Sequence, residues 1–317
     1  MSSRFSVWRR LALLSFGLGL PLAPPRLAAQ TLLYVSNLGT TTVSTYNSSS
    51  GAAVNTTLIT GAGPAYQMAL DGSGNLYISN YNTGVVAKYN ASTGAVINAS
   101  FITGLSSPYG IAVDGSGDLY VANTGTGIVG EYSALTGAVI NASLISGLSS
   151  PFAIALDGAG SLFVSNEGSG IVGKYNASTG SALNASLVTG LSQPYWLAVH
   201  SGDLYVSSPN SNVLGLYNAT TGATISASFI TSVSRPMGLA FDGQGHLFVA
   251  SYGNNVIGEY DATTGTTLSA SFITGLSTPY ALAFTPVPEP STLAMLAGGG
   301  SGLVAFAVIR RRRPTAA

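Results

Sequence analysis

The stretch LYVANTGTGIVGEYSALTGAVINASLISGLSSPFAIALDGAGS, residues 119–161, decides the fold of this chain because five other segments repeat its pattern. A leucine followed by tyrosine or phenylalanine marks each copy, in steps of 43, 43, 43, 42 and 43 residues. These leucines are Leu33, Leu76, Leu119, Leu162, Leu204 and Leu247. A period of about 40–45 residues made of short strands is typical of β-propeller blades.

The quoted unit divides into four predicted strands, residues 119–122, 127–132, 138–145 and 152–156, separated by turn signals. Gly137 can adopt the positive φ of a tight turn, and Asp157-Gly158 closes the fourth strand. Four short strands without a helical stretch predict one four-stranded antiparallel blade.

The phase of the repeat predicts how the ring closes. The body begins at the Leu33 strand and ends at a strand over residues 279–284, so the first and last strands must share one blade. A proline precedes each strand of the latter type, at Pro64, Pro108, Pro151, Pro194, Pro236 and Pro279. We therefore expect an all-β, six-bladed β-propeller over residues 31–285, closed by pairing of its terminal strands between Thr31 and Thr285.

Both ends of the chain have the composition of targeting segments. Residues 1–30 combine basic Arg4, Arg9 and Arg10 with an apolar run over 11–22 and small residues before Gln30, which predicts a signal peptide. The uncharged residues 293–309 are long enough to nearly cross a bilayer. The arginines that follow would hold the C-terminus in the cytoplasm and the repeats outside.

The C-terminal tail, residues 286–317, resembles the PEP-CTERM sorting signal of Gram-negative bacteria. Its three parts occur in the family's order: the motif Val287-Pro288-Glu289-Pro290-Ser291, the apolar span 293–309, and the basic cluster Arg310, Arg311, Arg312 and Arg313. The resemblance implies processing by an exosortase, a membrane-bound protease, after transient anchoring in the inner membrane. It also implies a place in the cell envelope or in extracellular polysaccharide.

The repeats resemble NHL and YVTN-type propeller units. Residues 108–114, PYGIAVD, and 118–121, DLYV, carry the resemblance. It implies the propeller fold but no single function, since such propellers include lyases, lactonases and binding scaffolds.

Charge and cysteine content exclude some functions. The formal net charge is zero, but residues 31–285 alone carry a net charge of −7, because eight of the eleven cations lie in the two ends. An acidic body argues against a nucleic-acid partner. The absence of cysteine excludes disulfides and thiolate chemistry.

Polar residues that recur in every unit have an architectural explanation and a functional one. Asp71, Asp114, Asp157 and Asp242 each precede a glycine, and we interpret them as turn residues rather than calcium ligands. Asn37, Asn80, Asn123 and Asn166 form a second set after the Leu-Tyr strand. Their amides can bind a sugar or a hydrated cation, or satisfy backbone groups between blades.

Charged residues at one repeat position, Lys88, Glu131 and Lys174, are interpreted as a solvated face. The places where the repeat fails are more informative. Gln67 and Trp196 stand where other units have small residues, and His200 stands where aspartate is usual. With Tyr195 they mark a candidate binding sector, in which Trp196 can stack on a sugar or simply fill space between blades.

No catalytic constellation emerges. The chain has two histidines, His200 and His246, and its glutamates are scattered. We therefore predict a protein that is not an enzyme, with no cofactor and no metal site, acting as a binding or structural module of the envelope or exopolysaccharide. The alternative, from fold analogy, is a metal-dependent lyase or lactonase.

Overall fold

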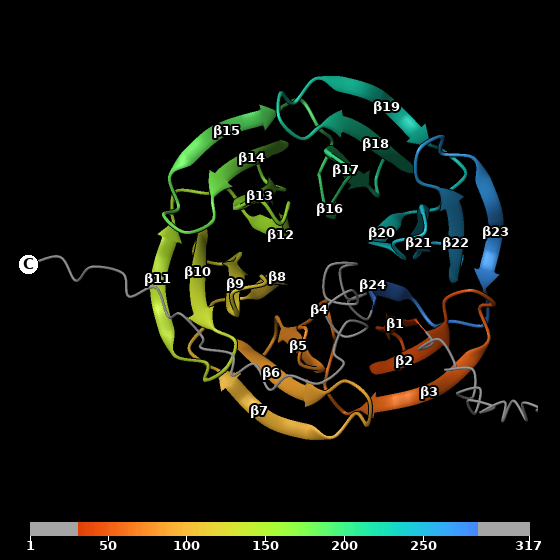
Figure 1. Ribbon diagram of the computed structural model, residues 1–317, viewed down its shortest axis with the longest axis horizontal. Coiled ribbons are helices and arrows are strands. Elements are labelled where there is room, and N and C mark those ends of the chain that lie inside the picture. The colour runs from red at the N-terminus through yellow and green to blue at the C-terminus, as the bar shows by residue number, and fades with distance from the viewer. Residues whose placement is uncertain (1–30, 285–317) are drawn as a thin grey trace, which may run out of the picture. The chain divides into compact units, whose positions relative to one another are not determined.

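The structure, a computed structural model, describes residues 31–284, which form six four-stranded antiparallel sheets arranged as blades around one axis (Figure 1). From the axis outward, blade 1 contains β24 (Pro279–Phe284), β1 (Leu32–Asn37), β2 (Thr42–Asn47) and β3 (Ala53–Thr60). Blade 2 contains β4 (Gln67–Leu70), β5 (Asn75–Asn80), β6 (Val85–Asn90) and β7 (Val96–Ile102). Blade 3 contains β8 (Pro108–Val113), β9 (Asp118–Asn123), β10 (Ile128–Ser133) and β11 (Val139–Ile145).

The remaining blades repeat this order. Blade 4 contains β12 (Pro151–Leu156), β13 (Ser161–Asn166), β14 (Ile171–Asn176) and β15 (Ala182–Val188). Blade 5 contains β16 (Leu197–His200), β17 (Asp203–Ser208), β18 (Val213–Asn218) and β19 (Thr224–Ile230). Blade 6 contains β20 (Pro236–Phe241), β21 (His246–Ser251), β22 (Val256–Asp261) and β23 (Thr267–Ile273). The predicted fold and number of blades are confirmed.

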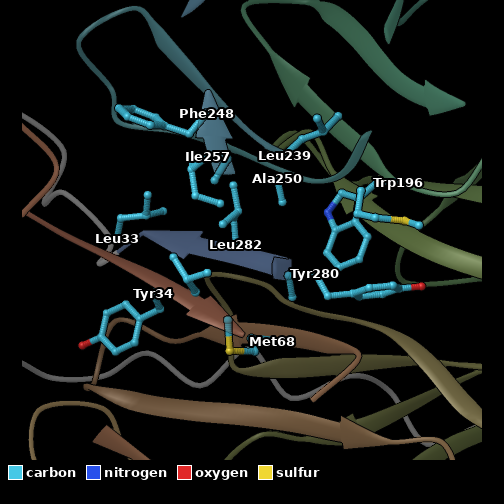
Figure 2. Packing of buried hydrophobic residues seen from close by; sticks show 14 of the residues in the cluster. Leu33, Tyr34, Met68, Trp196, Leu239, Phe248, Ala250, Ile257, Tyr280 and Leu282 are labelled. Atoms are coloured by element: carbon cyan, nitrogen blue, oxygen red, sulfur yellow. The ribbon is translucent and has the colours of Figure 1, made fainter. Parts of the chain in front are cut away.

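Blade 1 is built from both ends of the described chain, as the phase of the repeat predicts. Strand β24 pairs antiparallel with β1, with Leu33 opposite Phe284 and Val35 opposite Leu282. Figure 2 shows Leu33 and Leu282 packed at this junction with Phe248 of blade 6. The closing strand is therefore held by hydrogen bonds to its own blade and by apolar contact with the neighbouring one.

The ring has two faces, which we name by the innermost strands: they begin at the entry face and end at the exit face. The recurring aspartates lie in the hairpins of the exit face. Asp71 Oδ1 accepts hydrogen bonds from the backbone N–H groups of Ser73 and Asn75, both at 2.9 Å. Asp114, Asp157 and Asp242 accept the same pair of bonds in their own turns. Their interpretation as turn residues is confirmed.

Blade 5 lacks this aspartate turn, which accounts for the single 42-residue step. His200 pairs directly with Asp203 across a two-residue turn. Its central residues, Ser201 and Gly202, have φ of 52° and 85°, as a tight hairpin of this hand requires. One residue is saved, and His200 takes the place of the aspartate.

Tyrosines of the Leu-Tyr strands join neighbouring blades. The hydroxyl of Tyr34 donates to Ala91 O at 3.0 Å, that of Tyr77 to Ala134 O at 2.6 Å, and that of Tyr205 to Ala262 O at 2.7 Å. Each accepting carbonyl belongs to the next blade. The tyrosine hydroxyl thus supplies a donor to a buried backbone carbonyl that would otherwise lack a hydrogen bond.

The charged position next to this tyrosine is not a solvated face, and that prediction is wrong. Lys88 and Glu131 are only 7% and 1% exposed, because their side chains point into the interface between blades. The Lys88 ammonium donates to Ala134 O at 2.9 Å and lies 4.9 Å from the centre of the Phe101 ring. In blade 4, where Phe163 has no hydroxyl, Lys174 Nζ donates to Ala219 O at 3.2 Å. These lysines are inter-blade donors.

This arrangement predicts unequal costs for two identical substitutions. In Tyr205→Phe the carbonyl of Ala262 loses its side-chain donor, and Leu216 stands where blade 2 has a lysine. In Tyr77→Phe the carbonyl of Ala134 keeps the Lys88 ammonium, and Asp71 Oδ2, which also accepts from the Tyr77 hydroxyl at 3.0 Å, keeps its bond from Asn75 Nδ2 at 2.7 Å. We expect Tyr205→Phe to lower the free energy of unfolding by about 1–3 kcal/mol and Tyr77→Phe by less. Urea unfolding of both variants measures this; a larger loss in Tyr77→Phe would contradict the assignment.

Candidate functional site

Aromatic side chains from different blades meet on the axis of the ring. They occupy one repeat position, at or just before the start of the innermost strands, which is aromatic in five blades and methionine in the sixth. The set is Tyr66, Tyr109, Phe152, Tyr195, Met237 and Tyr280. Ring centres lie 5.0 Å apart for Tyr66 and Tyr109, 3.7 Å for Tyr109 and Phe152, and 4.3 Å for Phe152 and Tyr195. We call this set the axial cluster.

The axial cluster bridges blades that are not neighbours. The hydroxyls of Tyr109 in blade 3 and Tyr280 in blade 1 are hydrogen-bonded to each other. Trp196 of blade 5 adds its indole 6.0 Å from the ring centre of Tyr280, and Figure 2 shows these two side chains facing each other. Trp196 is only 3% exposed. Side chains therefore fill the axis at this level, and Trp196 is part of that filling.

Four tyrosines carry the cluster to the surface of the entry face. Tyr66 and Tyr195 are half-buried members of it, Tyr252 is half-buried beside Tyr280, and Tyr81 is 39% exposed. The ring of Tyr81 lies 5.9 Å from that of Tyr66. We call these four residues the tyrosine rim. Each presents a ring and a hydroxyl while resting on buried aromatic neighbours, so the surface is apolar, hydrogen-bonding and well supported.

Two charged residues flank the rim. The Arg235 guanidinium lies 4.9 Å from the ring centre of Tyr252, and Glu167 Oε1 accepts a hydrogen bond from Gln193 Nε2 at 2.9 Å. Burial raises the pKa of the Tyr195 hydroxyl, the Glu167 charge raises it further, and Arg235 opposes them. The rim offers π faces and hydroxyls. Nothing in its contacts supplies a general acid and base pair.

Gln67 begins β4 and Trp196 precedes β16, and each alters the innermost strand of its blade. A Cβ on Gly110, at their position in blade 3, would lie 2.5 Å from Phe152 O of the next blade, which explains the small residues elsewhere. Gln67 instead uses this gap, because its Oε1 accepts the N–H of Ile111 in blade 3 at 2.7 Å. Strands β4 and β16 are correspondingly short, with four residues each.

The predicted sector around Trp196 separates into two places. Tyr195 and Trp196 lie at the axis near the entry face, whereas His200 ends β16 at the exit face and stacks on Phe241 with ring centres 4.4 Å apart. The other histidine, His246, lies in the blade 6 turn, with Nδ1 2.8 Å from Asp242 Oδ2. Neither histidine belongs to the tyrosine rim. Among residues 31–284 no group of three or more acidic or histidine side chains is placed to hold a metal.

The four asparagines lie at the ends of their strands on the entry face and are buried. Their amides are bonded to the protein itself. Asn80 Oδ1 accepts from the N–H of Asn82 at 3.1 Å, and Asn123 Oδ1 accepts from that of Ser106 at 3.3 Å. Asn166 accepts from Ser149, and Asn37 donates to Ser44 and accepts from Ser277. These bonds hold the loops beside the strands, as the architectural interpretation of the asparagines expects.

Of the tyrosine rim, only Tyr195 was a candidate from the sequence, although a signal for Tyr66 is visible there as well. An aromatic residue follows the proline directly in blades 1, 3, 4 and 5, and one position later in blade 2. The other two rim residues, Tyr81 and Tyr252, are tyrosines in two units alone, so the repeat does not indicate them without the fold.

The predicted signal peptide, sorting motif and apolar span lie outside the described residues. Residues 286–313 nevertheless match the family model of the PEP-CTERM protein-sorting motif. This chain carries a PEP-CTERM sorting signal. That signal marks an exported protein of the Gram-negative cell envelope that is sorted by an exosortase. Within the part of the chain that is described, no helix has the length and hydropathy to cross a membrane.

Solved structures share the fold at low sequence identity. A chain from a nidogen/laminin complex matches with a TM-score of 0.68 and 15% identity, over 81% of this chain and 98% of that one. A Bacteroides caccae protein of unknown function gives 0.62 and 15%, over 81% and 99%. The designed Ika8 protein gives 0.51 and 16%, over 80% and 74%. These likenesses show the fold alone, and no curated protein matches the sequence.

The tyrosines also predict how stability depends on pH. Burial raises the pKa of Tyr109 and Tyr280 well above the ordinary value of 10.0, and that of Tyr205 to about 12. Above about pH 10 the unfolded chain loses these protons while the folded chain keeps them, so stability falls as pH rises. We expect the melting temperature to drop steeply above pH 10, with tyrosinate absorbance appearing together with unfolding. Ionisation of most tyrosines before unfolding would contradict this.

Proposed function

We propose that this protein is an exported envelope or matrix propeller that binds a neutral polysaccharide, without catalysis, through the tyrosine rim. The observation that carries the proposal is a surface of four tyrosines supported by a filled aromatic axis, in a chain with a PEP-CTERM sorting signal. A pyranose ring has an apolar C–H face and a periphery of hydroxyls. Tyrosine complements both, with its ring face and its hydroxyl.

Charge favours a neutral ligand. The net charge of residues 31–285 is −7, which disfavours anionic polymers at low salt. Among residues 31–284, Arg235 is the one cation beside the rim, and it already lies against Tyr252. Binding would rest on stacking and hydroxyl contacts, so it should depend only weakly on salt.

The absence of catalysis belongs to this proposal as well. Of the two charged residues that flank the rim, Glu167 accepts a hydrogen bond from the Gln193 amide and Arg235 lies against the Tyr252 ring, so each rests on a neutral neighbour. Turnover of a lactone or cleavage of a polysaccharide by the purified protein would overturn the non-catalytic part of the proposal, while leaving binding to be judged separately.

Binding is tested with the mature propeller and native exopolysaccharide in affinity electrophoresis, supported by a glycan array of neutral polymers. We expect Tyr81→Ala and Tyr252→Ala each to weaken retention about tenfold, because each removes a stacking surface of about 0.5–1.5 kcal/mol with its buried area. Leu135→Ala is the matched control, since Leu135 is 80% exposed in a hairpin of the exit face. Equal retention of all three variants would reject the rim as the site.

Sorting is tested in the native host by cell fractionation and intact mass. We expect the wild-type protein in the envelope or medium with a mass that lacks its C-terminal tail, and an uncleaved, membrane-bound form when the exosortase is deleted. Pro288→Ala with Glu289→Ala should reproduce the deletion. An unchanged mass in all strains would contradict processing, and the propeller's binding would remain measurable by the preceding experiment.

A further inference from the structure

A second site is present in blade 1, away from the axis. A pocket of about 210 Å³ opens between strands β1, β2 and β3 and the loop from β23 to β24. Its polar wall includes Asn37, Thr42, Ser44, Thr56 and Ser277, with Tyr46 beside them. We call it the seam pocket, because the loop and the strands come from opposite ends of the described chain. It shares no residue with the tyrosine rim.

The seam pocket coincides with departures of blade 1 from the repeat. At the position of Thr42 the other blades have valine or isoleucine, at that of Ser44 glycine or alanine, and at that of Thr56 alanine. The counterparts of Thr42 are Val85, Ile128, Ile171, Val213 and Val256. Those of Ser44 are Ala87, Gly130, Gly173, Gly215 and Gly258, and those of Thr56 are Ala99, Ala142, Ala185, Ala227 and Ala270. Three hydroxyls replace three apolar positions, and all three line one pocket.

Ser44 also changes what lies beneath the tyrosine of its strand. In blades 3 to 6 a tyrosine two residues later lies over the glycine: a Cβ on Gly130 would be 2.8 Å from the Tyr132 ring, and one on Gly173 would be 2.6 Å from the Tyr175 ring. In blade 1 the corresponding residue is Ser44, whose side chain is hydrogen-bonded to Tyr46, so a hydroxyl stands where those blades have bare backbone beneath the ring. Tyr46 is one of the residues that line the pocket.

The hydroxyls are held in place by the protein. Ser44 Oγ donates to Thr56 O at 2.7 Å and accepts from Asn37 Nδ2 at 3.2 Å. The hydroxyl oxygens of Thr40 and Thr42 are 2.8 Å apart. Buried Tyr46 and Leu276 supply apolar surface beside them. Such preorganisation lowers the cost of ordering side chains when a ligand binds.

Size and charge define the ligand class. No lining residue carries a charge at neutral pH, since the set consists of hydroxyl, amide, glycine, leucine and tyrosine side chains. The volume is that of about seven waters and lies below the roughly 300–1,000 Å³ of pockets for drug-sized ligands. One ring with several hydroxyls fits these limits, whereas an oligosaccharide does not.

We propose that the seam pocket binds a single ring of a neutral saccharide. Hydroxyls of that ring would exchange hydrogen bonds with Thr42, Ser44 and Thr56, and its C–H face would lie on Tyr46. The proposal stands on the pocket and on the repeat departures, and it holds whether or not the tyrosine rim binds polysaccharide. Because the wall joins both chain ends, a bound ring would also stabilise the closed propeller, as any ligand of the native state does.

The test returns blade 1 to the residues of the other blades. Thr42→Val, Ser44→Gly and Thr56→Ala are combined in one variant; each new residue already occupies that position elsewhere in the ring, so the fold should tolerate it. Binding of glucose, galactose, mannose and N-acetylglucosamine is followed by saturation-transfer NMR and by the rise in melting temperature. We expect at least one sugar to bind the wild type and to bind the triple variant about tenfold or more weakly, through loss of hydrogen bonds.

Two controls separate this site from the rim and from general effects. The Thr224→Val variant, which loses an exposed hydroxyl in blade 5, should bind the sugars as the wild type does. Tyr81→Ala should weaken polysaccharide retention but leave monosaccharide binding unchanged. If the triple variant does not fold, Thr56→Ala alone serves, with a smaller expected loss. Equal binding by the wild type and the variant, or no binding of any of the four sugars by the wild type, would overturn the proposal.

Discussion

The antiparallel pairing of β24 with β1 is the constraint on which the rest of this structure depends. Without it blade 1 would lack its innermost strand, and the apolar faces of blades 6 and 2 would lose the partner between them. The pairing is between strands some 250 residues apart in sequence, so it is formed against a large loop-closure entropy. The packing of Leu33 and Leu282 against Phe248, and the repeated tyrosine bonds between blades, supply the offsetting contacts.

The two candidate sites arise from the repeat in opposite ways. The axial cluster and the rim above it use a position that is aromatic in nearly every blade, so symmetry gathers similar side chains at one point. The seam pocket uses positions at which blade 1 alone differs. A sixfold scaffold thus allows one extended surface on its axis and one asymmetric pocket at its junction, without either disturbing the blades between them.

The sequence predicted what depends on distance along the chain and missed what depends on neighbours across the interface. Strand limits in the third unit and the aspartate turns follow from local alternation and turn chemistry, and both agree with the structure. Lys88 and Glu131 were misplaced because a charge within a strand indicates solvent only if that face is outside; here it meets the next blade. Trp196 and His200, four residues apart, were joined in one sector, although a four-residue strand carries them to opposite faces. The seam pocket could be recognised only from the strand register together with a comparison of equivalent positions in the six blades.

The positions of the chain ends give the ring a direction. Leu33 lies opposite Phe284, so the described chain both starts and finishes at the exit face, while Tyr280, at the other end of β24, lies at the entry face beside the rim. Phe284 is the last described residue, so the described chain leaves the ring on the side away from the tyrosine rim. The point at which the chain leaves the propeller therefore does not compete with the tyrosines for the same face.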